Sequence, residues 1–139
     1  MSVRKWLGIT LLAAAPAALA CGVCIEDKVA AVYDYDVVSR ALGQGHHVAF
    51  FAMEGPNAAG PEARRMLESL AGSAAGVDRG SSRVSLETRS LSVAYDSRRT
   101  PLARLQLALE KKFAARKLSL VPLKVIERPG ELTSVTRRR

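Results

Sequence analysis

The alternation of apolar and polar positions predicts four β-strands along this chain of 139 residues. An almost unbroken apolar run at residues 47–53 predicts a strand buried on both faces. Period-two alternation at residues 84–86 and 91–95 predicts a hairpin with one solvent-exposed face and a turn near residues 89–90. Residues 118–126 predict the last strand, and Pro122 places it at a sheet edge because proline cannot donate a ladder hydrogen bond.

Apolar residues at helical spacing predict three helices. One begins at Pro61 and ends just before Gly72, and another begins at Pro101. A third covers residues 24 to about 42, although Asp34 and Asp36 make its second half less regular. Without this first helix, the order strand, helix, strand, strand, helix, strand is that of the ferredoxin-like α+β fold. We therefore expect a ferredoxin-like sandwich with an extra N-terminal helix.

The beginning of the chain has the layout of a secretory signal peptide. Arg4 and Lys5 form a short basic region, residues 6–15 form an apolar stretch, and Ala18 and Ala20 supply small residues before a cleavage point. The mature chain would then be periplasmic or secreted, and its length suits one compact domain. The expected divisions are a signal peptide, a Cys-x-x-Cys segment with its helix, a ferredoxin-like domain and a basic tail, at residues 1–20, 21–45, 46–127 and 128–139.

Charge and aromatic content limit the kinds of partner. The net charge of +8 at pH 7 falls to about +6 without the signal peptide, and much of the remainder lies in the tail that ends in three arginines. Nucleic-acid binding is not expected, because only 5% of the residues are aromatic and such sites interleave aromatic rings with cations.

Residues 47–126 resemble the heavy-metal-associated (HMA) domain of copper chaperones and metal-transporting ATPases. The resemblance rests on Gly76-Val77 before the second strand, on Tyr95-Asp96 at the end of the hairpin, and on a leucine-rich helix at residues 105–109. It implies the same ferredoxin-like fold. The family binds soft metal through Met-x-Cys-x-x-Cys between the first strand and the following helix, but this chain has Asn57 and Gly60 at roughly the cysteine positions. The site of the family is therefore absent from that loop.

Both cysteines of the chain lie instead in Cys21-Gly22-Val23-Cys24. Two thiolates separated by two residues can bind one soft ion, and Cu(I) needs no further ligand, whereas Zn(II) needs more and is less expected. If the first helix runs antiparallel to the first strand, both cysteines lie near Met53, which could add a thioether ligand. We hypothesise a metal site of Cys21, Cys24 and Met53, and we expect the helix start to lower the pKa of the thiols.

Other interpretations of the cysteines stay open. They could form a redox-active or structural disulfide in an interaction module, since export favours oxidation. Cys21 could instead carry lipid and anchor a lipoprotein, the one case in which we expect membrane contact. His46 and His47 are expected at the opposite end of the first helix. A break of that helix near residues 34–36 would fold the cysteines back toward the histidines and favour zinc.

No pattern in the sequence suggests a catalytic nucleophile with its base, a phosphate-binding glycine loop or paired catalytic carboxylates. The expected function is therefore non-enzymatic binding or delivery of a soft metal such as copper. The expected partners are the metal ion and another metal-handling protein.

Overall fold

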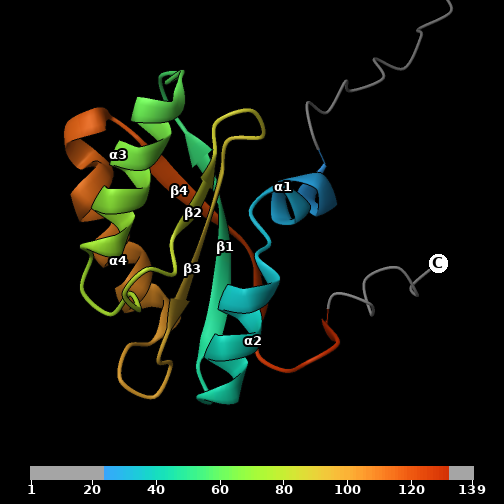
Figure 1. Cartoon of the computed structure of the whole chain (residues 1–139). Helices are drawn as coiled ribbons and strands as arrows, with labels where there is room; N and C mark the ends of the chain where they lie inside the picture. The colour runs from blue at the N-terminus through green and yellow to red at the C-terminus, as the bar shows by residue number, and fades with distance from the viewer. Residues whose placement is uncertain (1–23, 132–139) are drawn as a thin grey trace, which may run out of the picture.

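The computed structural model describes residues 24–131, in which one antiparallel sheet lies between two layers of helices (Figure 1). The strands, in the order β2-β3-β1-β4, are β1 (His47–Glu54), β2 (Arg83–Ser85), β3 (Ser90–Tyr95) and β4 (Ser119–Ile126). The helices are α1 (Ile25–Ala31), α2 (Tyr35–Gly43), α3 (Pro61–Gly72) and α4 (Leu102–Phe113), and a short 3-10 helix, η1 (Ala114–Arg116), follows α4. The predicted ferredoxin-like α+β fold is confirmed. Within residues 24–131, no helix is both long and apolar enough to cross a bilayer.

The main core lies between the sheet and the layer formed by α3 and α4 (Figure 1). Alternate residues of β1 point into it, and Phe51 is fully buried. Helix α4 contributes a stripe at helical spacing, Leu105, Leu109 and Phe113, each also fully buried. Burial of such a side chain contributes roughly 1.5–3 kcal/mol. The apolar residues whose spacing predicted this helix are therefore the ones that stabilise the fold by their burial.

A second, smaller core covers the other face of the sheet under α1 and α2. It joins Val29 of α1 and Val38 of α2 to Val48, Phe50 and other apolar residues of the sheet. The N-terminal segment therefore covers the face of the sheet that α3 and α4 leave open. The prediction of one continuous helix is wrong, because the chain leaves α1 after Ala31 and starts a new helix at Tyr35.

Asp34 explains why the chain starts a second helix. Its carboxylate accepts hydrogen bonds from the backbone N–H groups of Asp36 and Val37, at 3.0 and 3.1 Å, and so caps α2. The same carboxylate pairs with the Arg83 guanidinium at 2.8 Å. The residue that made the helical pattern irregular is therefore the N-cap of the next helix.

Strand β3 is buried along its whole length, so the predicted solvent-exposed face of the hairpin is wrong. Its polar residues Ser90 and Ser92 lie under the N-terminal segment, and the Ser92 hydroxyl donates a 2.7 Å hydrogen bond to the Val32 carbonyl oxygen. Serine is small enough to be covered and finds a partner, which keeps the cost of burying a hydroxyl low.

Strand β4 forms one edge of the sheet, as Pro122 predicts. Its register with β1 shifts between Phe50, which pairs with Lys124, and Phe51, which pairs with Pro122. Leu123 is the extra residue of this bulge. At the other edge, β2 has only three residues.

Candidate thiol site

Cys24 is exposed and stands at the N-cap position of α1. Its thiol donates a 3.1 Å hydrogen bond to the carboxylate of Asp27, one helical turn further on. Glu26 adds a second carboxylate to this first turn. Cys21 lies outside the described residues, and so does the predicted signal peptide. The structure therefore positions one of the two predicted thiol ligands.

Two hydrogen bonds fix α1 and the 55–60 loop to the same turn of the β2–β3 hairpin. Lys28 donates from its ammonium group to the Thr88 carbonyl oxygen at 2.6 Å. Arg89, the next residue, donates from its guanidinium to the Gly55 carbonyl oxygen, and its own carbonyl accepts from the Met53 N–H at 2.8 Å. Helix α1 therefore lies at the end of the sheet where β1 ends. The break after Ala31 does not fold α1 back toward the histidines.

The surroundings of Cys24 correct the expected thiol pKa. The backbone N–H of Asp27 favours the thiolate and acts to lower the pKa, but the nearby carboxylates favour the protonated thiol. The hydrogen bond to the Asp27 carboxylate and a weaker one to Glu26 raise it, and the net effect is a raised pKa of the Cys24 thiol. The expectation of a lowered pKa is therefore wrong for Cys24. A metal ion that binds this sulfur has to displace a proton that Asp27 helps to hold.

Met53 lies in the main core under α3 and α4 and is only 4% exposed. Helix α1 packs on the opposite face of the sheet. Met53 does border a small cavity of about 50 Å³ beside residues 56–58 and Arg89. The Met53 side chain and α1 therefore lie on opposite faces of this end of the sheet. The role of Met53 as a third metal ligand stays a prediction.

The 55–60 loop begins at a position that requires glycine. Gly55 has φ +135°, and a Cβ there would lie 2.5 Å from the Lys117 carbonyl oxygen. The loop contains no cysteine or histidine, and Asn57 is exposed. The observed loop is therefore a mostly exposed connection between β1 and α3 that packs closely only at Gly55.

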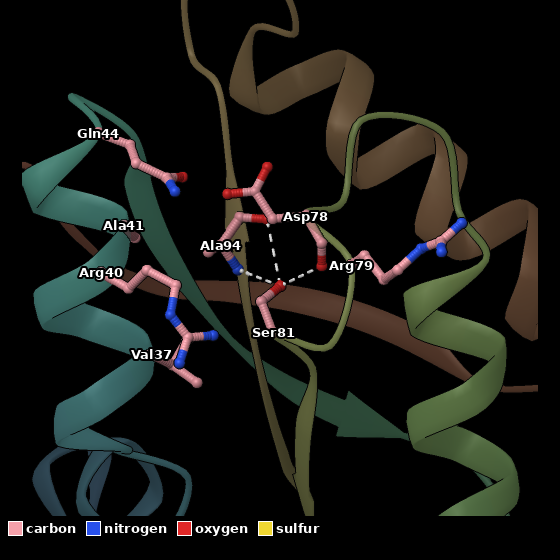
Figure 2. A pocket seen from close by; sticks show the side chains of 8 residues that line it. All are labelled: Val37, Arg40, Ala41, Gln44, Asp78, Arg79, Ser81 and Ala94. Atoms are coloured by element: carbon pink, nitrogen blue, oxygen red, sulfur yellow. Dashed lines mark hydrogen bonds between the residues drawn. The ribbon is translucent and has the colours of Figure 1, made fainter.

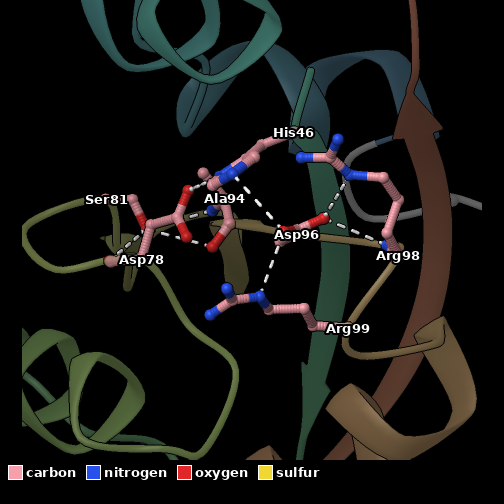
Figure 3. A network of polar contacts seen from close by, with 7 residues as sticks. All are labelled: His46, Asp78, Ser81, Ala94, Asp96, Arg98 and Arg99. Atoms are coloured by element: carbon pink, nitrogen blue, oxygen red, sulfur yellow. Dashed lines mark hydrogen bonds and ion pairs between the residues drawn. The ribbon is translucent and has the colours of Figure 1, made fainter. Parts of the chain in front are cut away.

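Both histidines lie at the other end of β1, as predicted, and both have polar partners. His46 Nδ1 lies 2.7 Å from an Asp78 carboxylate oxygen, and its Nε2 lies 3.8 Å from Asp96 (Figure 3). His47 makes a 3.3 Å contact with the Ser97 hydroxyl and an edge-to-face contact with Tyr95. These contacts tie the start of β1 to two connecting segments. They give the histidines a structural role.

A mixed polar and apolar groove of about 290 Å³ lies near the histidine end, between α2 and residues 78–81 (Figure 2). Arg40 and Gln44 line one wall, and Asp78 and Arg79 line the other. The Ser81 hydroxyl closes the floor by donating to the Asp78 carbonyl at 2.7 Å and accepting from the Ala94 N–H at 3.0 Å. No local pattern in the sequence indicates this groove, because its walls come from separate parts of the chain.

The sequence pattern did not assign the contact of Asp27 with the thiol, or the contacts by which Lys28 and Arg89 position α1 and the 55–60 loop. Asp27 could have been found, because a carboxylate three positions after a helix-starting cysteine lies beside it. Lys28 and Arg89 act through contacts between residues 60 and 34 positions apart, for which the sequence carries no local signal. Within residues 24–131, no three His, Cys, Asp or Glu side chains are grouped so that they could hold a metal ion.

The fold places the described residues in the class of ferredoxin-like α+β domains, with α1 and α2 added on the second face. No protein-family model matches the chain, and no curated protein sequence matches it. Among solved structures, it is similar to the crystal structure of oxidized MerP from Ralstonia metallidurans CH34, with a TM-score of 0.44 and 16% sequence identity over 57% of this chain and 99% of that one. It is also similar to the CopZ metallochaperone, with a TM-score of 0.40 and 23% identity over 53% of this chain and 98% of that one.

Proposed function

We propose that this protein is an exported, non-enzymatic binder of a thiophilic metal ion, with the thiolates of Cys21 and Cys24 as ligands. The observation that carries the proposal is the exposed Cys24 thiol, three residues after a second cysteine, on a helix fixed to the β2–β3 turn. Soft thiolates favour Cu(I), and two of them complete a linear site. Cu(I) is therefore the ion that the motif suits best.

The other candidate ligands are less suited to contribute. His46 and His47 are engaged at the far end of β1, and Met53 is buried on the α3 and α4 side of the sheet. A tetrahedral Zn(II) site would need ligands beyond the two cysteines. Two-coordinate binding of Cu(I) would need none, which is why we place zinc second.

The raised pKa of Cys24 gives the site a proton dependence. Below its pKa the thiol is mostly protonated and bonded to Asp27, so metal binding releases a proton from it. Affinity for Cu(I) should therefore rise with pH through the neutral range. A cysteine with an ordinary thiol pKa would show the same rise, but the rise would level off at a lower pH.

A competition titration tests the proposal. Reduced mature protein is titrated with Cu(I) against a chromophoric Cu(I) chelator, and we expect about one equivalent to bind. Cys21→Ser and Cys24→Ser should each abolish tight binding, because a single thiolate cannot chelate. Met53→Leu and a double histidine-to-asparagine variant at 46 and 47 serve as controls that keep the thiols. Metal retention by the double cysteine-to-serine variant would refute the proposal.

Mass spectrometry of the intact mature protein distinguishes the alternatives to a metal site. A mass lower by two hydrogens would indicate a disulfide between the cysteines. Added acyl mass at Cys21 would indicate a lipoprotein, and a thioether at that sulfur would remove one of the two proposed ligands. Either modification as the sole form of the protein would contradict the metal site.

A further inference from the structure

The charges of the described chain are separated across the sheet. Residues 24–131 hold 16 Lys and Arg and 13 Asp and Glu, a net charge of +3. Residues 96–117, which include α4 and η1, hold seven basic and two acidic residues and so have a net charge of +5. Residues 24–36, on the other face, hold four acidic and one basic residue. The segment that contains α4 is therefore strongly positive, and the segment that begins with Cys24 is negative.

The cations of α4 and its 3-10 extension are exposed and are not neutralised locally. None of the five forms an ion pair with another residue of the 24–131 region: Arg104, Lys111, Lys112, Arg116 and Lys117. The only carboxylate of α4, Glu110, accepts a hydrogen bond from the Gln106 amide at 3.3 Å. Five unpaired cations on one short segment produce a positive potential that a solvated, mixed-charge helix face would not have.

An exposed apolar side chain lies among these cations. Leu107 is 68% exposed, although α4 already buries Leu105 and Leu109 in the core. Arg104 and Lys111 lie three positions before and four positions after Leu107, so all three share one side of the helix. From Arg104 to Lys117 the cations extend over about 20 Å at 1.5 Å per residue. Arg104 and Lys111 therefore flank one protruding leucine on this side of α4, and the other three cations continue a cationic strip toward Lys117.

We propose that the outer side of α4 and η1 docks on an anionic lipid bilayer. A bilayer surface offers negative headgroups along the whole strip and an apolar layer beneath them for Leu107. Each Lys or Arg at such a surface contributes about 1 kcal/mol, and the buried stripe of α4 stays in the core, so the protein adsorbs without inserting. In this orientation Cys24, on the opposite face of the sheet, points away from the lipid.

Vesicle sedimentation tests the docking on metal-free protein, so it does not depend on the proposed metal site. The full mature chain is mixed with vesicles of phosphatidylglycerol and phosphatidylcholine, and with vesicles of phosphatidylcholine alone. We expect binding to the anionic vesicles only, weakened by added salt. The variant Arg104→Gln with Lys111→Gln should bind about 30-fold more weakly, since each lost cation costs about a factor of five.

The matched control removes two cations elsewhere. Arg40→Gln with Arg79→Gln changes two exposed cations that border the groove on the other side of the sheet (Figure 2). Because these cations do not face the bilayer in the proposed orientation, this variant should change binding by less than about threefold. Circular dichroism of both double variants confirms that they fold. A second background with the three terminal arginines replaced by serine should keep most of the binding.

Several results would overturn the proposal. Equal losses of vesicle binding in the two double variants would mean that binding depends only on the net charge of the protein. Loss of all binding with the terminal arginines would place the contact in the tail. Equal affinity for soluble polyglutamate would indicate an acidic protein as the partner. Binding to neutral vesicles, with acyl mass on Cys21, would bring α1 and not α4 to the membrane.

Discussion

Lys28 holds the thiol-bearing helix in place, and its replacement by methionine should loosen that helix alone. Helix α1 has seven residues, and its only buried residue is Val29. A helix this short is not stable by itself in water, so its position depends on contacts with the rest of the fold. The Lys28 ammonium supplies one such contact through its 2.6 Å hydrogen bond to the Thr88 carbonyl.

The size of the effect follows from the kind of hydrogen bond. A hydrogen bond to a charged group contributes about 1.5–3 kcal/mol, and the partial exposure of this one places it near the lower end. Methionine keeps the aliphatic stem and removes the ammonium. A loss of about 1.5 kcal/mol raises the population of undocked α1 by about tenfold. Lys28 is not part of the main core, so the stability of that core should change little.

Amide hydrogen exchange measured by NMR checks this prediction. Exchange of the α1 amides should accelerate about tenfold in Lys28→Met, while the amides of β1 and β3 keep their protection. Lys112→Met, which removes an exposed lysine from α4, is the matched control. Unchanged α1 exchange would show that Thr88 does not position the helix, and a uniform acceleration across the sheet would show that the substitution destabilises the whole domain.

Three further variants test other parts of the structure. Asp27→Asn removes a carboxylate that raises the pKa of Cys24, so alkylation of Cys24 by iodoacetamide at neutral pH should accelerate; an unchanged rate contradicts the hydrogen bond. Asp34→Ala removes the α2 cap and should lower the free energy of unfolding in urea by about 1 kcal/mol. Because bonding to backbone N–H groups keeps the pKa of Asp34 low, this loss should persist at neutral pH and disappear as the pH falls through that pKa. Gly55→Ala should lower the melting temperature more than Gly45→Ala, where φ is also positive but a Cβ meets nothing within 4 Å.

The sequence predicted the sheet and the two helices of its main layer because their apolar periodicity is set by one continuous core. It did not predict which face each residue of β1 occupies, since the strand is apolar on both sides. For this reason Met53 was predicted as a metal ligand. In the structure its side chain lies with Phe51 in the main core, on the face of the sheet that α3 covers. Ser92 is polar, and for that reason its face of the hairpin was predicted to be exposed. The N-terminal segment can cover Ser92 because the Val32 carbonyl accepts a hydrogen bond from its hydroxyl.

For Cys24, the sequence predicted the position in the fold and not the thiol pKa. The antiparallel return of the N-terminal segment brings α1 to the predicted end of the sheet, even with a break at Asp34 that redirects the chain. The pKa of Cys24 depends on the placement of the Asp27 and Glu26 side chains, and a helix-dipole argument ignores both. A thiol pKa of this kind depends on the positions of neighbouring side chains, and the apolar periodicity of the sequence carries no information about them.

The edges of the sheet determine how this protein can meet other chains. On one side, Pro122 and the bulge at Leu123 interrupt the row of backbone donors and acceptors of β4, and on the other β2 ends after three residues. A passing strand finds no long, regular edge on which to extend the sheet. These two edges thereby protect the domain against edge-to-edge aggregation. Recognition between this domain and any partner has to use side chains on its helices and loops, not shared β-structure.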